Sequence, residues 1–159
     1  MVSLTLQKYI TAFSRLKRGG TVYGLAPHKP VLLISLIELI AEGLVTENNV
    51  YVNADLVGTF KENWLLLVST AHQEDFTQPF FYLQNERAEG QGYWFLQPMP
   101  GCQINAHIKS VSVLASVCQY GYLAADLWLL LNDAVSRAYL RQVLLDTYFA
   151  ETKNNLINA

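Results

Sequence analysis

Cysteine is scarce in this chain, and its scarcity excludes two common ways of stabilising a small protein. Only Cys102 and Cys118 are present among 159 residues, and they form no CxxC pair. A disulfide-stapled scaffold needs several paired cysteines, and a closed zinc site needs four suitably spaced ligands. We therefore expect two reduced, structural thiols and a cytoplasmic location.

Long apolar runs are also missing. No run reaches the roughly 18 residues that a membrane-spanning helix needs. The first 17 residues lack the continuous apolar region and the small-residue cleavage site of a signal peptide. Hydrophobic residues nevertheless make up 52% of the chain and charged residues 15%, a composition that excludes disorder. We expect no membrane segment and one globular domain over residues 1–159.

The familiar motifs of catalysis are absent. The chain has no GxSxG nucleophile motif, no P-loop and no dinucleotide-binding glycine pattern. His28, His72 and His107 do not pair at helical spacing, and Cys102 with His107 is too small a set for a metal site. The carboxylates do not cluster as a metal-dependent nuclease would require. We predict no catalytic residue, no metal and no cofactor, and hence a binding protein.

Carboxylates are missing from the first 37 residues, and the first acidic residue is Glu38. Five of the eleven basic residues precede it: Lys8, Arg15, Lys17, Arg18 and Lys29. The net charge is −2, so the protein is no general nucleic-acid binder, but a local basic patch can neutralise a few phosphates. The alternative is an ordinary solvated helix face.

The most distinctive stretch that is present is a proline-bracketed turn, Ala26 to Pro30, which leads into an apolar segment. Pro30 suits the first turn of a helix, and the following residues predict a buried helix over about 30–42. The restriction before each proline predicts that His28 and Lys29 lie outside the helix end. A helix N-terminus beside a His and a Lys attracts phosphate. Alternatively, Lys29 is a solvated charge and His28 a cap.

The remaining sequence predicts a helix-dominated α+β fold, a single domain with a small antiparallel β-sheet. Asn53 is a good N-cap for a helix over 54–67, and Trp64 and Trp94 are assigned to the core. The chain from Thr152 onward is expected to fray. Further helices are expected over residues 3–17, 109–118, 125–131 and 134–149. Short strands are expected at 50–52, 80–83 and 93–96, the last two as a looped hairpin.

Three patches together resemble a known family. They are APHKPVLLISLIELI at 26–40, QPFFYL at 78–83 followed by GYWFL at 92–96, and LWLLLNDAVSRAYLRQVLLDTYF at 127–149. In this order and spacing they resemble the sulfur-binding domain of phosphorothioate-dependent restriction endonucleases, over roughly residues 5–150. Those enzymes join such a domain to an HNH nuclease, which this sequence lacks. The resemblance implies a reading domain that targets modified DNA for restriction.

The resemblance also implies a ligand and a site. The ligand is double-stranded DNA in which sulfur replaces one non-bridging phosphate oxygen. The family holds the sulfur in an apolar dimple around a proline, beside a His–basic pair. The matching positions here are His28, Lys29, Gln78, Pro79 and Tyr82. The family often has Tyr before this proline and a small residue three positions after it, so Gln78 and Tyr82 depart from its pattern.

Other residues are candidates for contacts beside such a site. Lys17 and Arg18 are expected to hold flanking phosphates, and Tyr23 and Arg87 lie in loops from which they can reach phosphates or bases. We expect the pocket between the turn at 26–30 and the loop at 76–82. A homodimer is possible. Two alternative functions stay open, namely a protein-interaction or dimerisation domain and an inactive nuclease remnant without sulfur specificity.

Overall fold

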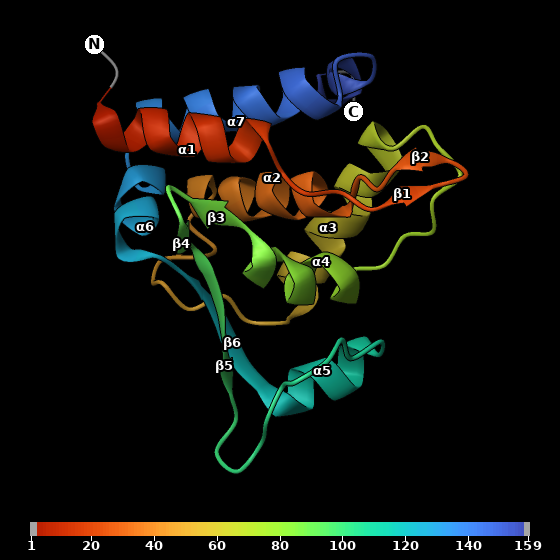
Figure 1. Ribbon diagram of the computed structural model, residues 1–159, viewed down its shortest axis with the longest axis vertical. Helices are drawn as coiled ribbons and strands as arrows, with labels where there is room; N and C mark the ends of the chain where they lie inside the picture. The colour runs from red at the N-terminus through yellow and green to blue at the C-terminus, as the bar shows by residue number, and fades with distance from the viewer. Residues whose placement is uncertain (1–2, 158–159) are drawn as a thin grey trace.

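Helix α2 (His28–Ala41) lies at the centre of the protein. The computed structural model describes residues 3–157, and Figure 1 shows α2 between the other helices. Twelve of its fourteen residues are buried, because it is apolar on nearly every face and exposing any face would cost free energy. The expected buried helix is therefore confirmed, although it begins two residues earlier than predicted.

Other helices surround α2. In Figure 1, α1 and α7 lie side by side along the upper side of the molecule, and α3 and α4 pack against α2 below them. Besides α2, the helices described in residues 3–157 are α1 (Leu4–Ser14), α3 (Ala54–Leu67), α4 (Thr77–Tyr82), α5 (Val111–Val117), α6 (Ala125–Leu131) and α7 (Ala134–Tyr148). Of these, α5 lies apart from α2 and packs on β6. Two short 3-10 turns, η1 (Leu83–Asn85) and η2 (Lys153–Leu156), complete the helical part.

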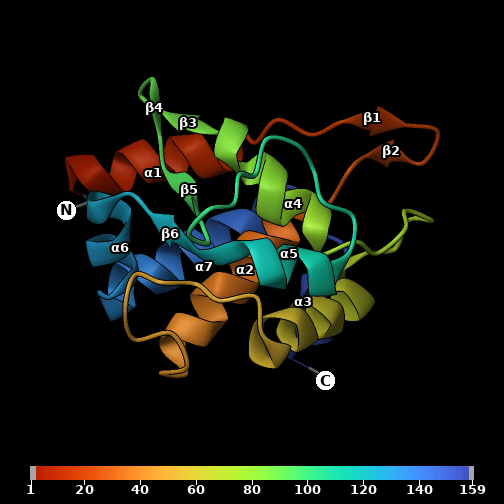
Figure 2. The same cartoon turned by 90° about the horizontal axis from the view of Figure 1, so that it is seen from below.

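The strands are short and form three separate two-stranded antiparallel sheets within residues 3–157. They are β1 (Gly20–Thr21), β2 (Gly24–Leu25), β3 (Arg87–Ala88), β4 (Gln91–Gly92), β5 (Trp94–Pro98) and β6 (Cys118–Leu123). The β1–β2 hairpin projects to one side (Figure 2), and the β5–β6 ribbon extends away from the other helices toward α5 (Figure 1). The protein is thus a helix-dominated α+β domain, as predicted.

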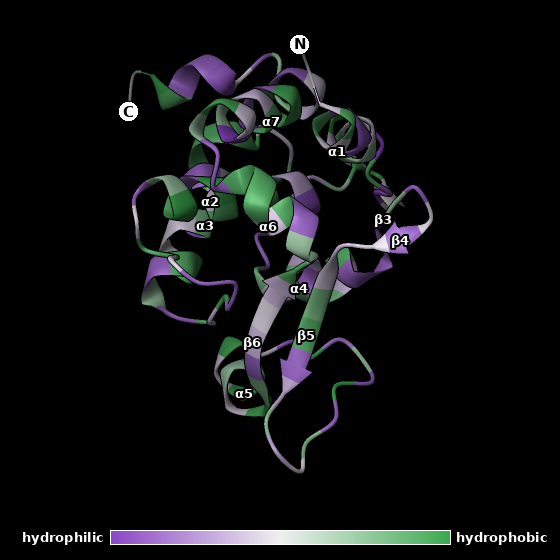
Figure 3. Cartoon of the chain, turned by 90° about the vertical axis from the view of Figure 1, so that its left-hand side faces the viewer, coloured by the Kyte–Doolittle hydropathy of each residue, from purple (hydrophilic) through white to green (hydrophobic). Residues whose placement is uncertain are grey.

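Hydropathy follows this arrangement. Figure 3 shows mostly hydrophobic residues in α2 and α6 and hydrophilic residues in β4. The one carboxylate of α2, Glu38, is bound by Arg141 of α7 at 2.8 Å and by Asn63 of α3 at 2.6 Å. These contacts fix α2 to two neighbouring helices and satisfy a charge that is otherwise surrounded by apolar side chains.

The structure confirms the predicted helix cap at Asn53 and the predicted burial of two tryptophans. Asn53 caps α3, since its Oδ1 accepts a hydrogen bond from the N–H of Leu56. Asp133 caps α7 in the same way by accepting from the N–H of Ser136. Trp64 and Trp94 are both buried, as expected. Side-chain capping is a local interaction, and it therefore survives the packing of the rest of the chain.

The predicted strand at 80–83 is wrong, because this segment forms the end of α4 and η1. Asp75 starts the helix by accepting hydrogen bonds from the N–H and Oγ1 of Thr77. Pro79 is tolerated because it stands in the first turn. Phe76 and Phe80, four residues apart, pack together in the core with their ring centroids 5.3 Å apart. Helical spacing of these aromatic residues outweighed their preference for strands.

The predicted hairpin between 80–83 and 93–96 is therefore also wrong. Strand β5 pairs instead with β6, about 25 residues later, with Trp94 opposite Leu123 and Leu96 opposite Gly121. The expected strand at 50–52 is reduced to a single bridge between Val50 and Gly121. Pairing between distant segments depends on tertiary packing, which local pattern does not reveal.

The end of α1 and the C-terminal segment after Thr152 also differ from the prediction. Helix α1 ends at Ser14, earlier than predicted, and Tyr148 of α7 binds the chain beyond it. The hydroxyl of Tyr148 donates to the carbonyl of Phe13 and accepts from the N–H of Leu16. The segment after Thr152 does not fray over the described residues, because Thr152 donates to the carbonyl of Leu67 at the end of α3.

No helix in residues 3–157 is long and apolar enough to cross a bilayer. Both cysteines are free, and burial raises the pKa of the Cys118 thiol to about 11. That thiol therefore stays protonated and unreactive near neutral pH.

Candidate nucleic-acid interface

A pocket of about 410 Å³ lies where three distant segments of the chain meet. Lys17, Arg18 and Gly19 come from the segment after α1, Ala26, His28 and Lys29 from the start of α2, and Gln78 and Tyr82 from α4. The pocket thus lies between the turn at 26–30 and the segment at 76–82, the two segments between which the resemblance places a ligand site. Six of the nine candidate contact residues line it.

The start of α2 forms one wall of this pocket. Pro27 is the N-cap residue and has no side chain that can accept a hydrogen bond from the first turn. The partial positive charge of the helix start is therefore not offset by a capping side chain. His28 and Lys29 belong to the helix, so the prediction that they lie outside its end is wrong. First-turn N–H groups have no helical partner, and Pro30 can occupy the third helical position without losing a bond.

His28 is buried, with 8% of its surface exposed, and only one of its two ring nitrogens has a hydrogen-bond partner in residues 3–157. Its Nε2 lies 2.9 Å from the carbonyl oxygen of Gln73, and since a carbonyl only accepts, Nε2 must donate. Its Nδ1 is buried and has no hydrogen-bond partner in residues 3–157. The ring packs against Trp64, with 4.7 Å between ring centroids.

Burial also determines the protonation of His28. Desolvation lowers the pKa of the imidazole below its ordinary value of 6.5, although the Gln73 carbonyl and the nearby Asp75 carboxylate oppose this effect. The ring is therefore neutral at pH 7, and Nδ1 is an unused acceptor. Protonation would convert Nδ1 into a buried donor without an acceptor, at a cost in free energy.

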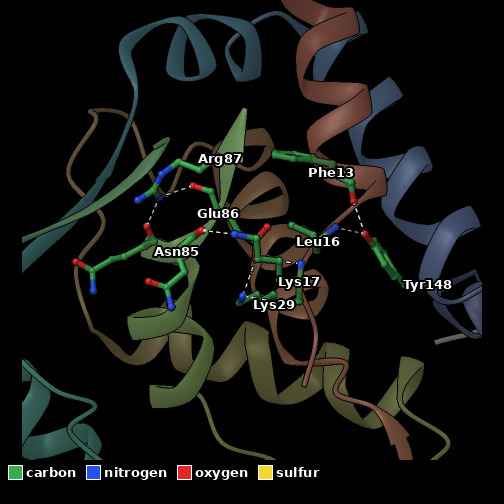
Figure 4. A network of polar contacts seen from close by, with 9 residues as sticks. Phe13, Leu16, Lys17, Lys29, Asn85, Glu86, Arg87 and Tyr148 are labelled. Atoms are coloured by element: carbon green, nitrogen blue, oxygen red, sulfur yellow. Dashed lines mark hydrogen bonds and ion pairs between the residues drawn. The ribbon is translucent and has the colours of Figure 1, made fainter. Parts of the chain in front are cut away.

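Lys29 lines the pocket, but its ammonium group is paired inside the protein. Its Nζ lies 2.6 Å from Oε2 of Glu86 and donates to the carbonyl of Lys17 at 2.9 Å. The same carboxylate oxygen accepts from the N–H of Lys17 (Figure 4). Glu86 therefore holds the segment after α1 against α2, and it offsets the charge that Lys29 would otherwise offer to a ligand.

Lys17 and Arg18 are the less constrained cations of the pocket. The side chain of Lys17 is exposed, and its Nζ makes only a long contact of 3.5 Å with the carbonyl of Asn85. Arg18 is half-buried and stacks over the ring of Tyr148 at 4.6 Å. Burial lowers the pKa of its guanidinium, which still remains charged at pH 7.

Helix α4 supplies the opposite wall. Gln78 and Tyr82 are four residues apart and both line the pocket, as one face of a helix requires. The Oε1 atom of Gln78 is buried without a partner in the described residues. Tyr82 is half-buried and packs edge-on to His107 at 5.3 Å. Pro79 is buried in the first turn of α4 and is not among the lining residues, so little of its ring surface is open to a ligand.

Tyr23 and Arg87 lie outside the pocket. Tyr23 stands in the turn of the β1–β2 hairpin, is 53% exposed, and packs edge-on to His72. Arg87 is on β3, and its Nη1 donates to the carbonyls of Gln84 and Glu86. The structure therefore brings together Lys17, Arg18, His28, Lys29, Gln78 and Tyr82, and it separates Tyr23, Pro79 and Arg87 from them.

Sequence reasoning missed the residues that support the pocket from behind. Glu86 neutralises Lys29, and Gln73 and Trp64 hold the ring of His28. Nothing in the local pattern around Glu86 distinguishes it from the other carboxylates, because its partner lies 57 residues earlier in the chain. Gly19, which follows the predicted site residue Arg18, was also missed.

Within residues 3–157, no three His, Cys, Asp or Glu side chains lie close enough to hold a metal ion. A comparison of the sequence with models of known protein families finds no match, and a comparison with curated proteins finds none. The geometry of the pocket is therefore the main guide to its function.

The stability of the protein is expected to fall as the pH drops below about 6.5. The unfolded chain then takes up a proton at His28, whereas the folded chain does so only at a lower pH. Each pH unit between the two pKa values corresponds to about 1.4 kcal/mol. Urea denaturation at pH 7.5 and 5.5 measures the loss, and His28→Asn should lose less than the wild type. Equal losses in the two proteins would show that His28 is not the responsible group.

Proposed function

We propose that this chain is a DNA-binding module that recognises phosphorothioate-modified duplex DNA in the cytoplasm. The modified phosphate would occupy the pocket at the start of α2. The observation that carries the proposal is the meeting of Lys17, His28 and Tyr82, from three separate segments, around an uncapped helix N-terminus. Such a helix start attracts a phosphate group.

The walls of the pocket suit sulfur. The ring of Tyr82 and the methyl group of Ala26 offer apolar surface beside the polar groups. Sulfur is large, polarizable and weakly hydrated, so contact with these groups gains dispersion energy and costs little solvation. A phosphate oxygen in the same place would lose water without a replacement, at a cost of about 1–3 kcal/mol. The apolar surface would therefore disfavour unmodified DNA.

The rest of the phosphate needs donors and positive charge. Lys17 and Arg18 can provide charge, and rotation of the Gln78 amide would present its NH₂ group in place of the unpaired oxygen. Lys29 contributes less than its position in the sequence suggested, because Glu86 already neutralises it. A site with few free cations would bind unmodified DNA weakly and lose affinity as salt rises.

The first test is a titration with two duplexes of identical sequence, one carrying a single phosphorothioate on each strand, at two salt concentrations. Tighter binding to the sulfur duplex in one of a panel of sequence contexts is the expected result. Equal affinity for both duplexes would leave a general DNA-binding domain. Failure to bind any context would reject the proposal.

Tyr82→Ala is expected to reduce the preference for sulfur by about 5- to 30-fold, which corresponds to about 1–2 kcal/mol. The substitution removes the aromatic wall and should change affinity for unmodified DNA much less. The matched control is Tyr122→Ala, which removes a half-buried tyrosine from the β5–β6 ribbon, outside the pocket. If both variants keep the wild-type preference, the sulfur does not contact Tyr82.

A second candidate function, protein interaction or dimerisation, is favoured by a row of aromatic residues on the β5–β6 ribbon and beside it. Phe95 stacks on Tyr122 at 5.2 Å, Tyr122 contacts Tyr120, and Tyr120 contacts Tyr51. Phe95 and Tyr51 are exposed. Sedimentation at increasing protein concentration tests this candidate, and a mass that stays monomeric would reject self-association.

A further inference from the structure

A second and larger groove, of about 610 Å³, lies between α1 and the β3–β4 hairpin. We call it the α1–β3 groove. Seven of its ten lining residues have polar side chains, and the other three are Leu4, Ala12 and Ala88. The lining residues that carry the following argument are Lys8, Thr11, Arg15, Arg87 and Glu89.

Within residues 3–157, the α1–β3 groove has two cations without an ion pair, Arg15 and Arg87, against one carboxylate, Glu89. Lys8 is neutralised by an ion pair with Asp126. Arg15 is exposed and has no ion pair or side-chain hydrogen bond within residues 3–157. Arg87 has no carboxylate partner there either, and the carbonyls of Gln84 and Glu86 hold one end of its guanidinium in place. Glu89, in the turn of the hairpin, is the one carboxylate among the lining residues.

The segment from Arg15 to Arg18 separates this groove from the pocket at the start of α2. Arg15 lines the groove, whereas Lys17 and Arg18 line the pocket. Glu86 and Arg87 are consecutive in the chain but serve different sites. The carboxylate of Glu86 binds Lys17 and Lys29 beside the pocket, whereas Arg87 lines the groove. In Figure 4, Arg87 and Lys17 lie on either side of Glu86. The two sites are neighbours with a shared wall.

We infer that the α1–β3 groove binds a second, unmodified phosphate of the same nucleic-acid strand, with Arg15 and Arg87 as its contacts. This inference rests on the proposed function, because it places the DNA at the pocket first. An arginine fork is well suited to phosphate oxygens, and the hydroxyl of Thr11 can add a hydrogen bond. The site contains no aromatic wall, so it would bind phosphate and phosphorothioate alike. Its contribution is affinity and register rather than sulfur specificity.

The test is the salt dependence of DNA affinity for Arg15→Gln. The slope of log K against log salt concentration is negative, and removing one phosphate contact should make it less steep by about 0.9. The same relation predicts roughly eightfold weaker binding at 0.1 M salt, with little difference from wild type near 1 M. Sulfur and oxygen duplexes should lose the same factor. Glu89→Gln should act in the opposite direction, because it removes a charge that repels phosphate.

The matched control is Arg137→Gln on α7, since Arg137 lies outside both the pocket and the groove. It should leave the slope at its wild-type value. A wild-type slope for Arg15→Gln, or a change no larger than that of Arg137→Gln, would overturn the inference. Equal wild-type affinity for the two duplexes would reject sulfur recognition alone, while the variant slopes would still decide on the groove. Absence of DNA binding would reject both.

Discussion

Glu86→Ala is expected to lower the free energy of unfolding by about 3–5 kcal/mol. Glu86 is 3% exposed, and its carboxylate lies 2.6 Å from the ammonium of Lys29, which is also buried. Removing it leaves the buried ammonium of Lys29 without a counter-charge, held only by the carbonyl of Lys17, and leaves the N–H of Lys17 without its acceptor. Urea denaturation followed by tryptophan fluorescence at pH 7 measures the change.

A second variant distinguishes the contribution of the ion pair to stability from that of side-chain packing. In Lys29→Met with Glu86→Leu, both charges are replaced by apolar groups of similar size, and we expect stability close to wild type because no unpaired charge remains. Asp146→Ala, which removes an exposed ion pair with Lys153, should change stability little. A small loss in Glu86→Ala would contradict the role of this pair. A loss in the double variant equal to that of Glu86→Ala would instead point to packing.

Gly121→Ala is expected to destabilise the protein by about 2–5 kcal/mol. A Cβ atom at Gly121 would lie 2.4 Å from the ring of Trp94, and Trp94 is 1% exposed and cannot move outward freely. The clash costs about 1–3 kcal/mol, and displacement of the indole would also strain its 2.8 Å hydrogen bond to the carbonyl of Phe80. The same urea denaturation measures the change.

Trp94→Phe provides the partner for a double-mutant cycle. The smaller ring leaves room for the added methyl group, so the double variant should be more stable than the sum of the two single changes predicts. Coupling of about 0.5–3 kcal/mol is typical of residues in contact. Strict additivity would show that the methyl group does not meet the indole. Trp94 donates a hydrogen bond to the carbonyl of Phe80 in α4. Gly121→Ala should therefore also lower the affinity for any ligand that contacts Tyr82 on the same helix.

The proposed DNA-binding surface is supported by a buried ion pair. Glu86 and Lys29 hold the segment after α1, which forms the wall shared by the pocket and the α1–β3 groove. Substitutions at this pair should therefore affect both sites, whereas Tyr82 and Arg15 should each affect one. Sulfur preference and salt slope can be measured for Glu86→Ala, for Lys29→Met with Glu86→Leu, for Tyr82→Ala and for Arg15→Gln. A variant that changes both quantities alters the shape of the surface, whereas a variant that changes one removes a direct contact with the ligand.

The sequence by itself determined the features that depend on neighbouring residues. The apolar run after Pro30 predicts a buried helix, and Asn53 predicts the start of α3, because helix propensity, capping and hydrophobic spacing act within a few residues. It also indicated that the segments around His28 and Gln78 lie close together. That prediction came from the resemblance rather than from the local pattern.

Only the tertiary structure decided which groups are free to meet a ligand. Lys29 looked like an available charge, yet Glu86 pairs with it across 57 residues. Pro79 looked like a pocket wall, yet the helical form of α4 buries it and turns Gln78 and Tyr82 to the pocket. Burial and ion pairing depend on segments that are distant in the chain, and short-range patterns carry no information about them.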